Sequence, residues 1–203
     1  LTYFPALGFP LTEPRNYFFA NLLYMTVNFA VMLLIFRRTL WQSLREFEGK
    51  MLLSVLIGFG MCYGANLVLT TAYTVLDIMP ENYNQEAVNS LLGGYPLAMT
   101  LCTVVLAPLA EECLFRGVLF APLARRCLPA AYALSMFLFA GMHVFQFLGS
   151  MTAANTILCL SLYLPASFSL CWVYQKTGNI WACIFLHMFI NFQSVLASLL
   201  RSL

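Results

Sequence analysis

Two adjacent glutamates, and an arginine four residues after the second, interrupt an otherwise apolar stretch of the chain. The stretch reads Leu106-Ala-Pro-Leu-Ala-Glu-Glu-Cys-Leu-Phe-Arg-Gly-Val-Leu-Phe120, and its charged residues are Glu111, Glu112 and Arg116. A charged side chain at bilayer depth costs at least ~2.5–3.5 kcal/mol even on lenient insertion scales. Three such charges close together need partners and a polar cavity, so this stretch predicts a functional site.

The composition places the stretch in a membrane protein. Hydrophobic residues make up 62% of the 203-residue chain and charged residues 9%, against roughly 45–50% and about 25% in a soluble domain. The net charge is +2 and the sequence contains no basic cluster, so it lacks the positive patch that nucleic-acid-binding proteins need. We therefore exclude that class of protein. The seven cysteines have no C-x-x-C spacing, and we interpret them as small buried hydrophobic residues.

Six apolar segments are long enough to cross the ~30 Å hydrocarbon layer, which takes about 20 helical residues. They are residues 17–36, 51–76, 91–120, 128–147, 151–174 and 180–200. The predicted fold is therefore an all-α, polytopic membrane helix bundle of about six transmembrane helices around a polar intramembrane cavity. Residues 1–90 are expected to form a lead-in and two transmembrane helices, and residues 91–203 a four-helix core that carries the charged site.

The connecting segments have their own predicted structures. Three prolines make residues 1–16 an irregular lead-in. Mixed charges with spaced apolar residues predict a short interfacial helix at 37–50. Residues 77–90 are polar and acidic and contain Pro80, which predicts the longest loop, on the opposite face of the membrane.

Basic residues predict the orientation, because they concentrate in cytoplasmic connections. Only Arg15 and Arg201 fall at the ends assigned to the outer face. The basic residues on the other side, which we assign to the cytoplasm, are Arg37, Arg38, Arg45, Lys50, Arg125, Arg126 and Lys176.

Polar side chains on three helices are predicted to meet at similar depths. At ~1.5 Å per residue from the cytoplasmic helix ends, Glu111, His143 and Asn191 lie at roughly 21, 22 and 18 Å. His187 and Arg116 form a second level at roughly 12 to 14 Å. The sequence therefore predicts that several helices contribute to one site.

Helix spacing assigns separate tasks to the two glutamates. Residues four apart are neighbours on a helix, so Glu112 and Arg116 are expected to form an ion pair. Glu111 points about 100° away and is left as a candidate general base or acid. Pro108 has no N–H, and we expect it to leave the Val104 carbonyl unpaired and to kink the helix.

The histidines and the asparagine complete a set of groups suited to amide hydrolysis. His187 and Asn191 are four residues apart and can donate hydrogen bonds to the oxyanion that develops at a carbonyl under attack. His143, on another helix, can share a water molecule with Glu111 and help to remove its proton.

At these residues the chain resembles the intramembrane proteases of the type II CAAX prenyl endopeptidase and bacteriocin-processing group, called CPBP or Abi. The family motifs are E-E-x-x-x-R, F-x-x-x-H and H-x-x-x-N on successive helices. Here they read Glu111-Glu112-Cys-Leu-Phe-Arg116, Phe139-Ala-Gly-Met-His143 and His187-Met-Phe-Ile-Asn191. The resemblance covers residues 91–200 and leaves the first two helices outside it.

This resemblance implies an intramembrane protease whose catalytic core is residues 91–203. It implies that Glu111 and His143 activate the attacking water and that Glu112 and Arg116 support them. His187 and Asn191 would hold the oxyanion. The implied substrate is a membrane-associated peptide or a lipidated protein tail.

A metal ion is an open alternative, because the family has been described as metalloproteases and two histidines with a glutamate can bind zinc. The ligands would be Glu111, His143 and His187. The sequence has no H-E-x-x-H motif, and the arginine beside the glutamates and the asparagine one turn from His187 favour a mechanism without a metal. We therefore expect no cofactor.

Two other classes of protein share some of these features. A non-catalytic membrane scaffold or immunity protein is one alternative, since families of this kind include members whose role need not be cleavage. A small proton-coupled transporter is the other, because buried carboxylates and histidines also build proton pathways. The expected partners are the substrate and membrane lipids, and the short loops and small size favour a prokaryotic plasma membrane.

Overall fold

The computed structural model describes residues 3–4, 9–10 and 13–201, so half of the predicted lead-in lies outside the described residues. A two-residue antiparallel ribbon, β1 (Tyr3–Phe4) with β2 (Phe9–Pro10), precedes the helices. The helical elements are α1 (Pro14–Arg45), α2 (Met51–Val75), α3 (Tyr83–Gly94), α4 (Pro96–Leu101), η2 (Cys102–Leu106), α5 (Ala107–Glu112), η3 (Cys113–Phe120), α6 (Ala121–Ala124), α7 (Leu128–Val144), η4 (Phe145–Ser150), α8 (Ala153–Thr177) and α9 (Ile180–Arg201).

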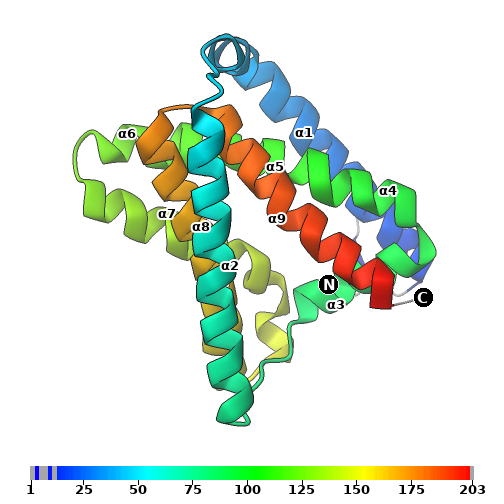
Figure 1. The fold of residues 1–203 in the computed structure, drawn as a ribbon. Helices are drawn as coiled ribbons and strands as arrows, with labels where there is room; N and C mark the ends of the chain where they lie inside the picture. Colours follow the sequence, from blue (N-terminus) through cyan, green and yellow to red (C-terminus); the bar gives the residue numbers. More distant parts are fainter. Residues whose placement is uncertain (1–2, 5–8, 11–12, 202–203) are drawn as a thin grey trace.

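Six helical stretches are long and apolar enough to cross a membrane, which confirms the predicted all-α, polytopic bundle. They cover Arg15–Arg45, Met51–Val75, Pro96–Ala124, Leu128–Ser150, Ala153–Thr177 and Ile180–Arg201. In Figure 1, α2 and α8 run side by side, whereas α9 and the α4–α5 stretch extend away from them toward the start of α1. The orientation of the bundle in the membrane stays a prediction.

The first helix is longer than predicted, and the prediction of a separate interfacial helix at 37–50 is wrong. α1 continues through Arg45 because residues 15–48 contain neither glycine nor proline to end it. Its last turns are held by the start of α9. The Trp181 Nε1–H donates to the Leu40 carbonyl at 2.8 Å, and Asn179 Nδ2 donates to the Ser43 carbonyl at 2.7 Å.

A helix, α3, occupies much of the segment for which a loop was predicted, residues 77–90. Asn82 begins this helix, because its Oδ1 accepts a hydrogen bond from the Gln85 N–H at 3.1 Å. Pro80 precedes the cap and therefore does not interrupt the helix. The apolar face of α3, with Leu91 and Leu92, packs against α1, α4 and α9.

The third span is not a uniform α-helix. Two π-helical segments, η2 and η3, lie on either side of the short α5. In η2 the Ala107 N–H bonds the Cys102 carbonyl, and at the end of η3 the Ala121 N–H bonds the Arg116 carbonyl, each five residues back. Single π turns inside α-helices occur frequently at functional sites. The two glutamates end α5, directly between these segments.

The connection between α8 and α9 is a tight turn that sets both helices against the third span. Gly178 ends α8 in the left-handed conformation, at φ 62°, which glycine adopts without a steric penalty. Asn179 then caps α9, since its Oδ1 accepts hydrogen bonds from the Trp181 N–H at 2.9 Å and the Ala182 N–H at 3.3 Å.

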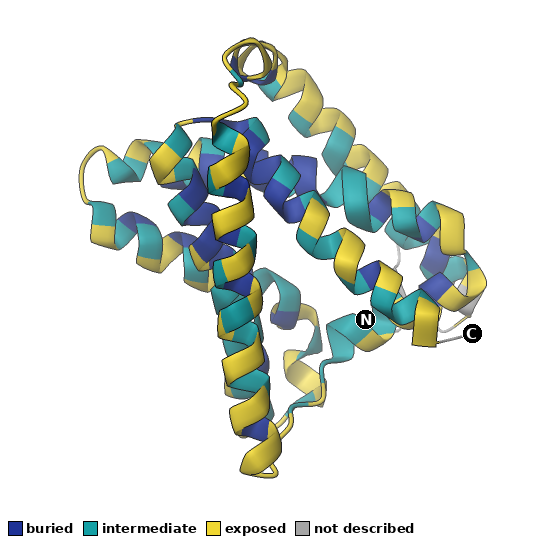
Figure 2. Ribbon diagram, viewed as in Figure 1, coloured by how far each residue is buried: buried dark blue, intermediate teal, exposed yellow. Residues whose placement is uncertain are grey.

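The first two spans are far less buried than the third. In the apolar window of each span, 6% of residues in α1 and 17% in α2 are buried, against 39% in the third span. Figure 2 shows the buried residues concentrated where α8, α9 and the third span meet. α2 approaches this core at Gly58, where a Cβ would lie 2.6 Å from the Val173 side chain and 2.9 Å from that of Leu186. All seven cysteines are free; six are buried as predicted, whereas the prediction is wrong for Cys127, which is exposed in the turn before α7.

Candidate active site

The predicted ion pair between Glu112 and Arg116 is present and completely buried. Arg116 Nη1 donates to Glu112 Oε1 at 3.1 Å, and Arg116 Nε lies 3.1 Å from Glu112 Oε2. Both side chains have a relative exposure of 0%. A planar guanidinium that meets both oxygens of one carboxylate compensates much of the desolvation cost of the two charges.

Arg116 also ties the third span to α7 and α8. Its Nη2 donates to the Ser167 carbonyl at 3.2 Å and to the Ser167 hydroxyl at 3.4 Å. The guanidinium carbon lies 5.1 Å from the centre of the Phe139 ring, within the range of a cation–π contact. The Ser167 hydroxyl in turn donates to the Ser135 carbonyl of α7 at 3.4 Å. The arginine therefore holds three helices together at the depth of the glutamates.

His187 of α9 completes this group, which we call the buried cluster (Glu112, Arg116 and His187). Its Nδ1 lies 2.7 Å from Glu112 Oε1. An ionised carboxylate only accepts hydrogen bonds, so Nδ1 carries the hydrogen and the ring is fixed in orientation. The other nitrogen, Nε2, lies 3.8 Å from Glu111 Oε2, too far for a hydrogen bond.

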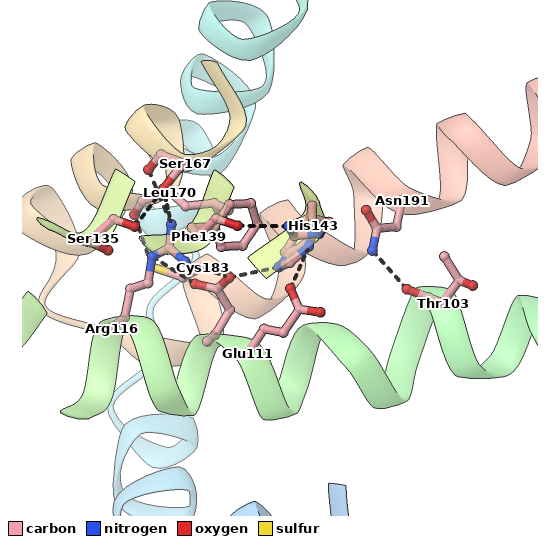
Figure 3. Close-up of polar contacts among 12 residues, drawn as sticks. Thr103, Glu111, Arg116, Ser135, Phe139, His143, Ser167, Leu170, Cys183 and Asn191 are labelled. Carbon is pink, nitrogen blue, oxygen red and sulfur yellow. Dashed lines mark hydrogen bonds and ion pairs between the residues drawn. The ribbon is translucent and has the colours of Figure 1, made fainter. Parts of the chain in front are cut away.

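Glu111 differs from its neighbour in nearly every contact. Its side chain retains a relative exposure of 19%. Its Oε2 atom is nevertheless buried and has no hydrogen-bond partner among the described residues. Figure 3 shows Glu111 and Arg116 projecting from the same helix, with Arg116 directed toward Ser135 and Ser167. A buried carboxylate oxygen without a partner is costly, so it marks a group that is available to a ligand.

His143 lies near the end of α7, one helical turn after Phe139. Its Nδ1 is 2.9 Å from the Phe139 carbonyl, so Nδ1–H donates there and Nε2 is left free of this bond. The Phe139 ring lies 4.8 Å from the His143 ring and 5.6 Å from the His187 ring, measured between centroids. The described residues contain no direct hydrogen bond between His143 and Glu111, and a shared water stays a prediction.

Asn191 bonds the main chain of the third span (Figure 3): its Nδ2 donates to the Thr103 carbonyl at 2.8 Å. The π turn explains why this carbonyl receives a side-chain donor. The Ala107 N–H is directed to the Cys102 carbonyl, and Pro108, five residues after Thr103, has no N–H. The bonded carbonyl is thus one residue before the Val104 carbonyl that a regular α-helix would leave unpaired.

The six predicted site residues thus lie in two sets. The buried cluster is directly bonded, whereas Glu111, His143 and Asn191, which we call the half-buried group, are each partly exposed. Sequence reasoning did not identify Ser167 and Thr103 as partners. A serine in the apolar α8 segment is a weak signal, and the Thr103 carbonyl became a partner only through the π turn.

The described residues contain no group of three His, Cys, Asp or Glu side chains placed to hold a metal ion. The three candidate zinc ligands, Glu111, His143 and His187, do not form such a group. No step below therefore depends on a metal.

Comparison with known proteins places the region that carries these residues. Residues 93–193 match the family model described as type II CAAX prenyl endopeptidase Rce1-like. Over 166 residues the chain is 28% identical to the "Putative membrane peptidase YdiL" of Bacillus subtilis (strain 168). The alignment covers 79% of this chain and 64% of that protein's length. No solved structure matches the chain.

Proposed function

Residues 93–193 belong to the Rce1-like type II CAAX prenyl endopeptidase family, and on that premise we propose that the chain hydrolyses peptide bonds within the membrane. Its substrate is a membrane-associated peptide or a lipidated protein tail, and its partners in the bilayer are lipids. The bacterial origin of the similar protein supports a location in a prokaryotic plasma membrane.

The observation that carries the proposal is the difference between two adjacent carboxylates. Glu112 Oε1 accepts hydrogen bonds from Arg116 and His187, and its Oε2, which accepts none from the described residues, lies 3.1 Å from Arg116 Nε, so protonation of Glu112 would break an ion pair. Glu111 has a buried oxygen without a partner, 3.8 Å from His187 Nε2. A general base needs such an oxygen within reach of the reacting water.

We propose the following order of bond formation, proton transfer and bond cleavage. Water attacks the substrate carbonyl carbon while its proton passes to the Glu111 carboxylate, and His143 orients the water. The carbonyl oxygen becomes an oxyanion. The carbon–nitrogen bond then breaks, and the leaving amine takes the proton from Glu111. Atoms and charge balance without any further reactant.

Two donors are available to the oxyanion in this scheme. His187 bonds Glu112 through Nδ1, which leaves Nε2 on the side of Glu111 to donate to the oxyanion when it carries a hydrogen. The Asn191 carboxamide has two hydrogens on nitrogen, and only one is directed to the Thr103 carbonyl. The buried cluster holds His187 in this orientation.

The test uses purified protein in liposomes and two internally quenched peptides. One ends in a farnesylated cysteine followed by three residues, and the other is the same peptide without the lipid. Wild-type protein is expected to cleave at least the lipidated peptide, and Glu111→Gln is expected to abolish cleavage. Glu48→Gln is the matched control, because Glu48 is exposed on the α1–α2 turn and pairs only with Lys50 among the described residues.

A second measurement covers a substrate that neither peptide represents. Membrane peptides from cells that carry Glu111→Gln in place of the wild type are compared by mass spectrometry, and uncleaved precursors are expected to accumulate. An unchanged peptide profile, with the variant present in the membrane, would exclude the protease and favour a scaffold or immunity protein. Proton flux into liposomes that Glu111→Gln abolishes would favour a transporter.

We also propose that hydrolysis needs no metal ion. The absence of an H-E-x-x-H motif from the sequence and the Arg116 charge beside the glutamates support this. Activity is expected to survive prolonged treatment with a strong chelator. Loss of activity that zinc restores and magnesium does not would overturn this part of the proposal.

A further inference from the structure

The imidazole of His143 is enclosed by two aromatic rings from different helices. Phe139, one turn earlier on α7, lies on one side. Tyr163 of α8 stacks on the His143 ring, with centroids 4.5 Å apart and an interplanar angle of 24°. The Nδ1 bond to the Phe139 carbonyl fixes one edge of the imidazole. Together these contacts leave the ring little rotational freedom about its side-chain torsions.

The Tyr163 hydroxyl makes two hydrogen bonds, one as donor and one as acceptor. It donates to Asn82 Oδ1 at 3.0 Å and accepts from Asn84 Nδ2 at 3.2 Å. Asn82 is also the residue that caps α3 through the Gln85 N–H. The tyrosine that packs on His143 is therefore anchored to the start of α3.

The segment that carries these asparagines is hydrogen-bonded to Asn155, at the start of α8. The Glu81 N–H donates to Asn155 Oδ1 at 2.9 Å, and Asn155 Nδ2 donates back to the Glu81 carbonyl at 3.0 Å. This reciprocal pair fixes the backbone directly before Asn82. The asparagine anchors are thus held in place independently of Tyr163.

We propose that Tyr163 is a positioning residue for His143, and that Asn82 and Asn84 act on the histidine through the tyrosine hydroxyl. The proposal rests on the proposed function. In this arrangement the residues at the start of α3 set the plane of the His143 imidazole indirectly, through Tyr163 of α8. The Nε2 atom of His143 is then held at a fixed distance from the water that Glu111 activates.

The direct test is a histidine NMR spectrum, because the chain contains only two histidines. Tag-free protein with ¹³C-labelled histidine is studied in detergent, and His143→Gln assigns the two ring signals. A ring stacked on an imidazole shifts its signals upfield. Tyr163→Leu is expected to move the His143 signal downfield and to leave the His187 signal in place, while Tyr163→Phe keeps most of the shift.

The kinetic test separates positioning from substrate binding. Tyr163→Leu is expected to lower kcat about 10²-fold at nearly unchanged KM, since a misplaced catalytic group costs about this much. Tyr163→Phe retains the stacked ring and is expected to lose only about tenfold. Tyr132 provides the matched control, because its hydroxyl bonds Gln175 on the same helix pair, away from the site. Tyr132→Phe and Tyr132→Leu are expected to leave kcat unchanged.

The asparagine anchors are tested by combining substitutions. Asn84→Ala removes one hydrogen-bond donor and leaves the cap of α3 intact. If Asn84 acts through the hydroxyl, the double variant Asn84→Ala with Tyr163→Phe is expected to have the kcat of Tyr163→Phe alone. Multiplied effects would overturn the role of Asn84.

The outcomes separate this inference from the proposed function. An unmoved His143 signal in Tyr163→Leu, or an unchanged kcat, would overturn the role of Tyr163 even if the wild type cleaves the peptides. If the wild type cleaves neither peptide and cells accumulate no precursors, the proposed function fails, and the NMR spectrum still decides whether Tyr163 sets the position of His143.

Discussion

The buried cluster and the half-buried group adjoin at the consecutive residues Glu111 and Glu112 but are stabilised in different ways. Glu112, Arg116 and His187 satisfy one another through short, charged contacts between side chains. In the half-buried group, by contrast, His143 and Asn191 bond main-chain carbonyls, and Glu111 Oε2 has no hydrogen-bond partner among the described residues. Glu112 Oε2 also accepts no hydrogen bond from the described residues, but it lies 3.1 Å from Arg116 Nε within the ion pair, whereas Glu111 Oε2 lies 3.8 Å from His187 Nε2.

This difference indicates a division of labour. The contacts of the buried cluster hold helices together, since Arg116 bonds Ser167 of α8 and lies over the Phe139 ring of α7. Bonds to carbonyl groups orient a side chain and leave its other polar atom available. Substitutions in the two sets should therefore fail in distinct ways, in folding for one and in turnover for the other.

Arg116→Met is expected to have the largest effect, because it leaves Glu112 charged and buried without its cation. Removing one partner of a buried ion pair costs about 3–5 kcal/mol, so both thermal stability in detergent and activity should be lost. Replacing both residues, as Arg116→Met with Glu112→Met, should restore much of the stability and none of the activity. A stable, active Arg116→Met protein would contradict the proposed role of the buried cluster.

Glu111→Gln is expected to have the next largest effect, confined to catalysis. Loss of a general base lowers kcat by about 10²–10⁴-fold, while the melting temperature should stay close to that of the wild type, because no bond to another described side chain is lost. The measurement is peptide cleavage beside thermal unfolding of the same sample. A fall in stability comparable to that of Arg116→Met would remove the distinction between the two sets.

Asn191→Ala is expected to reduce both kcat and thermal stability, kcat by less than Glu111→Gln and stability by less than Arg116→Met. The loss of an oxyanion donor costs about 10²–10³-fold in kcat, and the unpaired Thr103 carbonyl costs about 1–3 kcal/mol of stability. Asn191→Asp removes the donor and keeps the size of the side chain, so it should be no more active. Full activity in either variant would assign Asn191 to packing alone.

Ser167→Ala is expected to have the smallest effect. Arg116 retains its bond to the Ser167 carbonyl and loses only the 3.4 Å contact with the hydroxyl. The expected loss is about 0.5–1.5 kcal/mol of stability with unchanged kcat. A large change in kcat would show that the buried cluster takes part in turnover more directly than we propose.

The sequence predicted the features that depend on local pattern. Apolar segments of sufficient length gave the six spans, and the four-residue spacing of Glu112 and Arg116 gave their ion pair. The depth estimate also placed His187 with Arg116, and the structure joins both to Glu112. Such features need only the geometry of one helix or the thickness of a membrane.

Features that depend on contacts between distant segments could not be predicted in this way. The last turns of α1 are held by Asn179, from a distant part of the chain. The start of α3, by contrast, depends on the local cap from Asn82 to Gln85, a signal that the prediction of a loop overlooked. The stacking of Tyr163 on His143 joins two helices whose relative rotation no single motif specifies. The boundary proposed at residue 90 is still a prediction.

The π turn before the glutamates means that the number of residues in η2 is a separate requirement for the site. A chain that lacked one residue of η2 would keep all three motifs letter for letter. Its glutamates would nevertheless lie one residue closer to α4, and the wide turn beside the bond from Asn191 to the Thr103 carbonyl would be lost. Matching the motifs in a genome would not detect that loss of alignment, whereas counting residues between Pro96 and Glu111 would.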